Sequence, residues 1–213
     1  MNTPVSKQNE IQIAFFNAAW QRNQNAIKKA IEQGAEPDHK MRRGLTALQY
    51  GCMMRQLNMV KTLLEAGIPP TAKQQPWFQI NHPLALAAIN DSLPIFKLLL
   101  KHKASYMDKA TYDWFHSRPI VFVLIELFMF HTKDLIPYFE ELFKAGLDPN
   151  LVDKDMPQNI SPNATLLVEA IWQWRYPDSG NFVRYLLRKG ADPNNKTIRG
   201  NTIQKSLKII LAR

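Results

Sequence analysis

Side chains that could bind a metal or act as a nucleophile are scattered along this 213-residue chain. Zinc ligands come as closely spaced histidines, such as H-x-x-x-H, or as cysteine pairs. The histidines are His39, His82, His102, His116 and His131. None of them has a zinc-type partner at this spacing, and the single cysteine, Cys52, has no second cysteine to pair with. The sequence therefore predicts no metal site and no cofactor.

Three aspartates near the middle of the chain, Asp148, Asp153 and Asp155, have a spacing that suggests a calcium loop. An EF-hand loop also requires a glycine at its sharp turn and a glutamate as its last ligand, and this segment has neither. The chain has only 8 glycines and no glycine-rich phosphate loop. These residues form no catalytic constellation, and we expect a protein that is not an enzyme.

The chain also lacks the sequence features of an exported or membrane protein. One cysteine excludes an internal disulfide and is typical of a reducing compartment. The polar segment from Met1 to Glu10 does not resemble a signal peptide. The most apolar stretch, from Ile120 to Phe130, is shorter than the roughly 20 residues that a membrane span needs. We expect a cytoplasmic protein with no membrane partner.

The formal charge of +9 is unevenly distributed. Residues 1–75 carry 10 Lys/Arg against 5 Asp/Glu, and residues 156–213 carry 9 against 3, whereas residues 76–155 carry 8 against 10. Two basic ends therefore flank a slightly acidic middle. Such a surface favours anionic partners, but it does not distinguish a protein partner from a nucleic acid.

The elements that must position these side chains are recognised from an internal repeat. Five apolar helical stripes end at a similar closing position, with separations of 33, 36, 43 and 44 residues, and four of them are followed three residues later by proline. Glycine suits this position because the residue after a helix often adopts a left-handed backbone, which a Cβ disfavours. The closing residues are Gly34, Gly67, Lys103, Gly146 and Gly190.

A second element recurs after each closing turn, with its best examples at 43–48 (RGLTAL) and 82–88 (HPLALAA). The two elements together resemble the ankyrin repeat, whose period is 33 residues, and the resemblance covers roughly residues 10–213. The chain is similar to stand-alone bacterial ankyrin proteins, including toxin-immunity ankyrin proteins. It departs from the family at Lys103 and at the signature histidine, which is replaced by Gln49, Ala85, Val121 and Leu167.

The resemblance implies an all-α fold, an ankyrin-repeat solenoid of about five helix-pair repeats plus a C-terminal capping helix. We expect an N-terminal tail at 1–9 and a single domain at 10–213. Its repeats are expected at approximately 10–40, 41–73, 74–110, 111–152 and 153–195, with the cap at 196–213. The helix pairs should cover 10–33, 46–66, 82–102, 118–145 and 164–189, with the first helices of the last two repeats lengthened at about 127–137 and 173–181.

The family binds partners through its first helices and its loop fingers, and the resemblance places candidate contacts at those positions. They are rich in the aromatic, Met and Arg side chains that dominate interfaces. We expect partner contacts at Arg42, Arg43, Leu45, Met53, Met54, Trp77, Phe78, Trp114, Phe115, Glu126, Trp172, Trp174, Tyr176, Lys196 and Arg199. Asp153 is also expected on a finger, and Ile125 and Ile171 on exposed helix positions. The alternative for the loop aromatics is that they cover core edges created by the insertions.

Trp172 is the preferred single hot spot. On a helix, Trp172 and Tyr176 share a face, whereas Trp174 points elsewhere, so all three cannot be buried against one neighbour. The leading hypothesis is a protein-binding module that blocks a partner with an acidic or mixed-charge surface, such as a toxin domain, in the manner of an immunity protein. A bacterial effector or scaffold is the alternative, and a nucleic-acid-binding protein is the alternative from another class.

Overall fold

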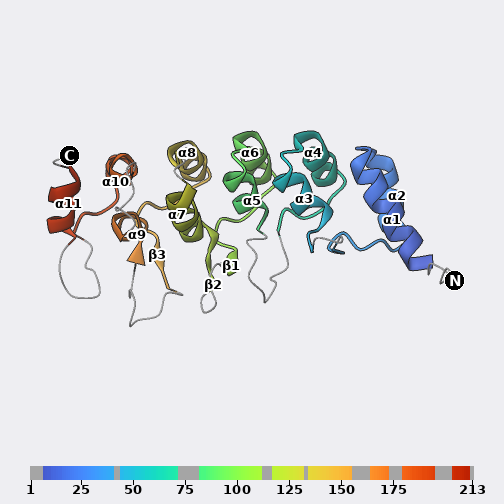
Figure 1. The fold of residues 1–213 in the computed structure, drawn as a ribbon, viewed down its shortest axis with the longest axis horizontal. Coiled ribbons are helices and arrows are strands. Elements are labelled where there is room, and N and C mark those ends of the chain that lie inside the picture. The colour runs from blue at the N-terminus through green and yellow to red at the C-terminus, as the bar shows by residue number, and fades with distance from the viewer. Residues whose placement is uncertain are drawn as a thin grey trace. The chain divides into compact units, whose positions relative to one another are not determined.

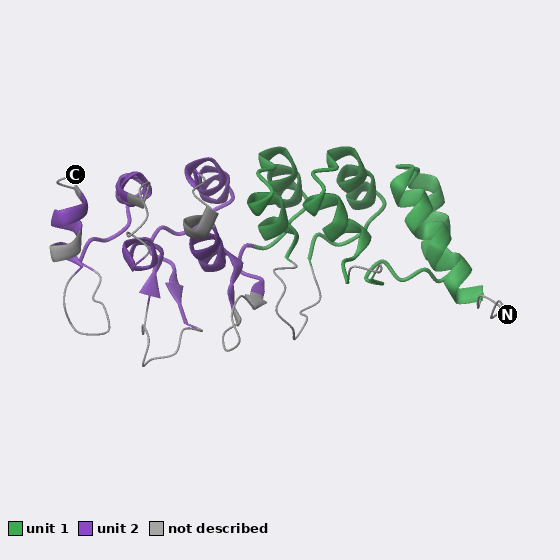
Figure 2. Cartoon of the chain, viewed as in Figure 1, with its two compact units in different colours: residues 1–73, 81–105 green, residues 74–80, 106–213 purple. Residues whose placement is uncertain are grey.

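The computed structural model describes residues 7–40, 44–71, 82–111, 117–131, 134–154, 164–172, 179–194 and 203–211. The chain divides into two compact units, shown in different colours in Figure 2. Unit 1 comprises Met1–Lys73 and Asn81–Ser105, and unit 2 comprises Gln74–Ile80 and Tyr106–Arg213. In the described part of the chain, no helix is both long and apolar enough to cross a membrane.

Unit 1 contains three antiparallel helix pairs stacked side by side (Figure 1). The first helices α3 and α5 pack on each other, as do the second helices α4 and α6. The helices are α1 (Lys7–Trp20), α2 (Gln24–Glu32), α3 (Ala47–Met53), α4 (Leu57–Glu65), α5 (Pro83–Ile89) and α6 (Leu93–Lys101).

Local sequence explains where several of these helices begin. Thr46 and Gln49 form a capping box at α3, in which each side chain bonds the backbone N–H of the other residue, and this satisfies two donors that a helix start leaves open. Asn23 caps α2 through its side chain. His82 caps α5, and Pro83 occupies a first-turn position where its missing N–H costs nothing.

Unit 2 continues the alternation of first and second helices and adds two short antiparallel strand pairs, β1 with β2 and β3 with β4. Each strand pair directly precedes a first helix, so the residues that lead into α7 and α9 are held by hydrogen bonds. The elements are β1 (Lys109–Thr111), β2 (Ser117–Pro119), α7 (Ile120–His131), α8 (Ile136–Lys144), β3 (Val152–Asp153), β4 (Ala164–Thr165), α9 (Leu166–Trp172), α10 (Ser179–Arg188) and α11 (Gln204–Leu211).

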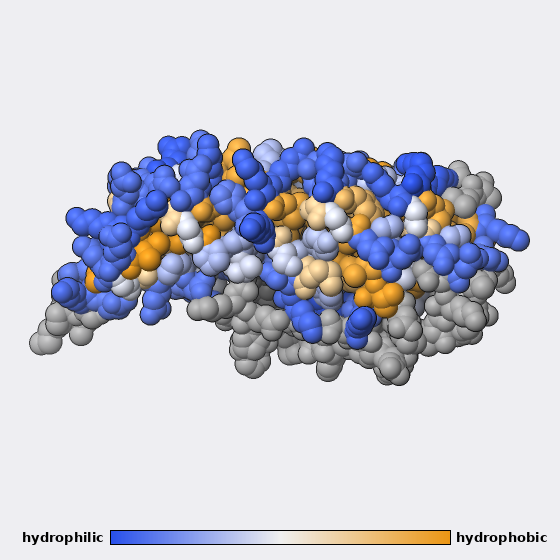
Figure 3. Space-filling view, turned by 180° about the vertical axis from the view of Figure 1, so that it is seen from behind, coloured by the Kyte–Doolittle hydropathy of each residue, from blue (hydrophilic) through white to orange (hydrophobic). Residues whose placement is uncertain are grey.

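The first and second helices differ in burial. Every described side chain from Ile120 to Ile125 in α7 is buried, and so is every one from Leu166 to Ile171 in α9. The second helices are amphipathic and place charged side chains outward, so the surface along them is mainly hydrophilic (Figure 3). Lys61, Lys97 and Lys101 are exposed there as predicted.

The predicted closing positions are confirmed by the backbone. Gly34, Gly67, Gly146 and Gly190 have φ values of 102°, 93°, 94° and 97°, and Lys103 takes the same left-handed region with φ 66°. The closing turn therefore keeps its conformation in the third pair, although a lysine carries a Cβ into a region that glycine occupies at little cost.

The described residues confirm an all-α fold with five helix pairs and a C-terminal helix, close to the predicted bounds. The predicted tail is too long, because α1 begins at Lys7. The lengthening of the fourth first helix is confirmed, since α7 has 12 residues and α3 has 7. The fifth first helix, α9, ends at Trp172 with 7 residues, and residues 173–178 lie outside the described part.

Candidate functional site

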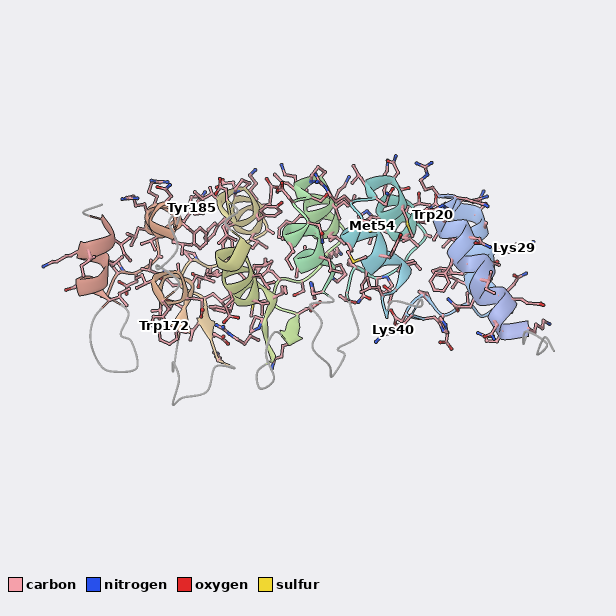
Figure 4. The ribbon with its side chains drawn as sticks, viewed as in Figure 1. Trp20, Lys29, Lys40, Met54, Trp172 and Tyr185 are labelled. Carbon is pink, nitrogen blue, oxygen red and sulfur yellow. The ribbon has the colours of Figure 1, made fainter. Side chains whose placement is uncertain are left out.

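Large apolar side chains are exposed at the junctions between the helices of the first two pairs. Trp20, the last residue of α1, is 62% exposed, and Met54, which caps the end of α3, is 44% exposed (Figure 4). Leu57, the first residue of α4, is 39% exposed. The rings of Trp20 and Tyr50 meet with their centroids 6.0 Å apart, and Met54 follows Tyr50 by one helical turn. We call the group formed by Trp20, Tyr50, Met54 and Leu57 the Trp20 surface.

A hollow of about 190 Å³ adjoins this surface within unit 1. Its wall residues are Trp20, Arg22, Gln56 and Met59, of which Met59 is buried and the other three are exposed. An apolar cavity of about 150 Å³ accommodates a benzene molecule. The hollow is therefore large enough to receive one apolar side chain from a partner.

The charge around the Trp20 surface is positive. Unit 1 carries 13 Lys/Arg against 6 Asp/Glu, a formal charge of +7, whereas unit 2 carries 14 against 12, a formal charge of +2. Arg22 and Arg55 follow the ends of α1 and α3 and are both exposed. Apolar anchors with arginines beside them are a typical composition of a protein interface centre.

Only part of the predicted contact set lies among the described residues. Met54 is exposed, while Met53 and Trp172 are half-buried. The remaining predictions for loop fingers and for the segment after α9 fall outside the described residues, so their surface position stays a prediction. These residues are Arg42, Arg43, Trp77, Phe78, Trp114, Phe115, Trp174, Tyr176, Lys196 and Arg199.

Several predicted surface positions are wrong because their side chains are buried. Leu45 precedes α3 and is only 6% exposed. Ile125 and Ile171 belong to the fully packed faces of α7 and α9. Asp153, expected on a finger, has no exposed surface. Each of these residues lies in the core instead of facing a partner.

Glu126 and Asp153 both bind a buried arginine, Arg118. The guanidinium of Arg118 on β2 donates from Nε to Oδ2 of Asp153 at 2.6 Å and from Nη2 to Oε2 of Glu169 at 2.7 Å. Its Nη1 donates to Oε1 of Glu126. The Arg118 side chain is 4% exposed, and Glu126 retains 16%. The predicted contact Glu126 is therefore part of an internal ion cluster.

The electrostatics of this cluster favour a permanently charged arginine. Burial alone lowers the pKa of Arg118, but the carboxylates of Glu169, Glu126 and Asp153 more than reverse this effect and raise the pKa above its usual value. The guanidinium also lies over the Phe122 ring, 5.4 Å from its centroid. A planar group with five donors in fixed directions can reach three carboxylates on different elements, whereas the three donors of a lysine ammonium leave one compact point charge. The cluster is suited to holding β2, β3, α7 and α9 together.

Sequence reasoning did not identify Trp20, Arg22, Arg55 or Arg118 as important. A signal existed for the cluster, because Glu126 and Glu169 stand inside apolar helical runs, and a buried carboxylate requires a cation or several donors. No comparable signal existed for Trp20, since its exposure depends on which helix ends meet in the stack.

The repeat resemblance predicts that Cys52, at a small-residue position between helices, is a buried structural thiol. Cys52 is fully buried, and burial raises the pKa of its thiol well above the usual range, so the prediction of a structural thiol is confirmed. In the part of the chain that the structure describes, no group of three His, Cys, Asp or Glu side chains could hold a metal ion.

Comparisons with known proteins agree with this architecture. Residues 15–110 match the sequence model of a family described as "Ankyrin repeats (3 copies)". No curated protein sequence matches the chain. Among solved structures, a chain from a Bdellovibrio bacteriovorus complex of the predatory endopeptidase Bd0816 with the immunity protein Bd3460 is similar, with a TM-score of 0.59 and 20% identity. The similarity covers 93% of this chain and 92% of that one.

Proposed function

Because residues 15–110 of this chain belong to the ankyrin-repeat family, we propose that the protein binds a partner protein and blocks it, as an immunity-type inhibitor of a toxin enzyme. Ankyrin arrays present extended surfaces, built by stacking one small unit on the next, and these surfaces bind other proteins. Two features remain to be identified, namely the surface of this array that binds the partner and the effect of binding on the partner's activity.

The Trp20 surface is the observation that carries the proposal. An exposed tryptophan normally costs hydration free energy, and a cluster of exposed apolar side chains on a monomer indicates a binding site. Here Trp20 is the last residue of α1 and Met54 caps the end of α3, so the backbone of both residues is already held by its helix before a partner binds. Tryptophan is one of the residue types that are enriched among binding hot spots, which cluster near the centre of an interface.

Inhibition would be steric. A unit of formal charge +7 attracts an acidic partner and accelerates its association, after which the apolar anchors slow its dissociation. The fold likeness to a chain from a complex of an endopeptidase with an immunity protein supports the inhibitor class. A partner enzyme covered in this way loses substrate access without any chemistry performed by this chain.

The test is purification of a partner on the tagged chain from the source organism, with Trp20→Ala/Met54→Ala as the control bait. We expect one stoichiometric partner that the control bait does not retain. Its enzymatic activity should fall linearly with added chain and reach zero at a 1:1 ratio. A partner whose activity is unchanged at saturation would contradict inhibition and favour a scaffold.

The positive charge of unit 1 favours nucleic-acid binding as a second candidate function. Binding of this kind depends on counterion release, so log Kd should change linearly with log salt concentration. A 20-nucleotide single strand titrated from 50 to 300 mM salt measures this directly. We expect weak binding that disappears at about 150 mM salt, since the described residues place two arginines, Arg22 and Arg55, at the apolar surface.

A further inference from the structure

The turn between the two helices of a pair places a left-handed residue at the same point in each pair of unit 1. These residues are Arg22 with φ 59°, Arg55 with φ 57° and Asp91 with φ 54°. Left-handed backbone is least costly for Gly, Asn and Asp. Asp91 follows that preference. Arg22 and Arg55 do not, because arginine disfavours left-handed backbone.

The left-handed turn itself belongs to the repeat, because it recurs in all three pairs of unit 1, and what distinguishes the first two pairs is an exposed arginine at that point. Arg22 also lines the hollow beside Trp20. In the described part of the chain, no ion pair joins either guanidinium to an acidic side chain. The sequence contains no Asp or Glu from residue 11 to 31 or from residue 39 to 64. The positive charge at this surface is therefore not neutralised by its own segments.

We propose that the Trp20 surface binds an acidic segment of a partner protein, which inserts one apolar side chain into the hollow and directs carboxylates to Arg22 and Arg55. This inference rests on the proposed function, because it assumes a protein partner, and it narrows the chemistry of that partner. Trp20 and Met59 are the apolar residues of the wall, and an aliphatic or aromatic side chain can pack against them, while Arg22 and Gln56 make the rest of the wall polar. Arginine binds carboxylates through paired, charge-assisted hydrogen bonds, which fixes the orientation of the segment.

The probe is a library of random 12-residue peptides displayed on phage and selected on the full chain. We expect enrichment of peptides in which an aromatic or large aliphatic residue is flanked by Asp or Glu. An enriched peptide, made synthetically, should bind with an affinity that falls as salt is added. Trp20→Ala should weaken its binding by at least about 10-fold.

The decisive variant is Arg22→Asn/Arg55→Asn. Asparagine suits the left-handed turn, so the melting temperature should stay the same or rise, while affinity for the acidic peptide falls by about 10-fold or more. The matched control, Lys97→Asn/Lys101→Asn, removes the same charge from exposed positions of α6 in the same unit. That control should change the affinity by no more than about 2-fold.

Three results would overturn the inference. The first is that the selected peptides contain no acidic residues. The second is that the Arg22→Asn/Arg55→Asn variant binds the acidic peptide as tightly as the natural chain does. The third is that an oligonucleotide or a second copy of the chain binds this surface more tightly than the peptide does. These experiments test this inference and the proposed function separately. If acidic peptides bind as expected but the partner enzyme is not inhibited, only the inhibitor role is contradicted. If inhibition persists in the Arg22→Asn/Arg55→Asn variant, only this inference is contradicted.

Discussion

The guanidinium of Arg118 and the carboxylate of Asp153 form a buried ion pair with an Nε–Oδ2 distance of 2.6 Å, which links β2 to β3. These two strands precede different first helices, and Glu126 on α7 and Glu169 on α9 bind the same guanidinium. One side chain therefore connects four elements of unit 2. Removal of that side chain would leave three carboxylates in the interior without their shared cation.

Arg118→Met should destabilise the protein by about 3–5 kcal/mol, because loss of one partner from a buried ion pair leaves uncompensated charge. Arg118→Lys should recover only part of this loss, since a lysine cannot bond three carboxylates in fixed directions. Urea unfolding followed by circular dichroism measures the difference. The control is Lys144→Met, which breaks the exposed pair with Glu141 and should change the stability far less than Arg118→Met does. Equal costs for Arg118→Met and Lys144→Met would show that the cluster contributes little.

Lys103→Gly should stabilise the protein by up to about 1 kcal/mol, because Lys103 occupies the left-handed closing position with φ 66°. The same substitution two turns earlier, Lys97→Gly, lies within α6 and should destabilise the protein by about 1 kcal/mol. Thermal unfolding of both variants should therefore shift in opposite directions. A shift in the same direction would mean that the lysine side chain contributes more than the backbone conformation.

The thiol of Cys52 should react with a thiol reagent only as fast as the surrounding helices open. The side chain is fully buried, and burial raises its pKa, so little nucleophilic thiolate is present at neutral pH. The rate of labelling by a coloured disulfide reagent, with and without denaturant, measures this protection. Immediate labelling of the native protein would show that Cys52 is accessible.

The repeat architecture could be predicted because its determinants are local. The closing glycine and the proline three residues later both act on the backbone close to them in the sequence. The apolar stripe lies within a single helix. Gly34 and Gly190 mark the first and the last closing turn. The Arg118 cluster depends on residues 35 and 51 positions apart. The two glutamates of the cluster stand in apolar runs of the sequence, which indicates that they are buried. Their spacing in the sequence does not show that they bind Arg118.

The proposed binding surface is harder to predict from the sequence, for a physical reason. Met54 was identified by its position late in a first helix and is exposed. Leu45 is predicted on a loop finger that precedes α3, but its side chain is buried. Exposure at helix ends depends on the neighbouring pair, which is why Trp20 next to Tyr50 was found only in the structure.

The affinity of the purified partner for the chain is the most direct test of the central claim, that the Trp20 surface binds a protein. Calorimetric titration compares the natural chain with Trp20→Ala/Met54→Ala and with Ile209→Ala, which truncates an exposed apolar residue of α11 in unit 2. We predict a loss of at least about 2 kcal/mol, roughly 30-fold in Kd, for the double variant in its folded state, and less than about 2-fold for Ile209→Ala. An unchanged Kd for the folded double variant would contradict the account.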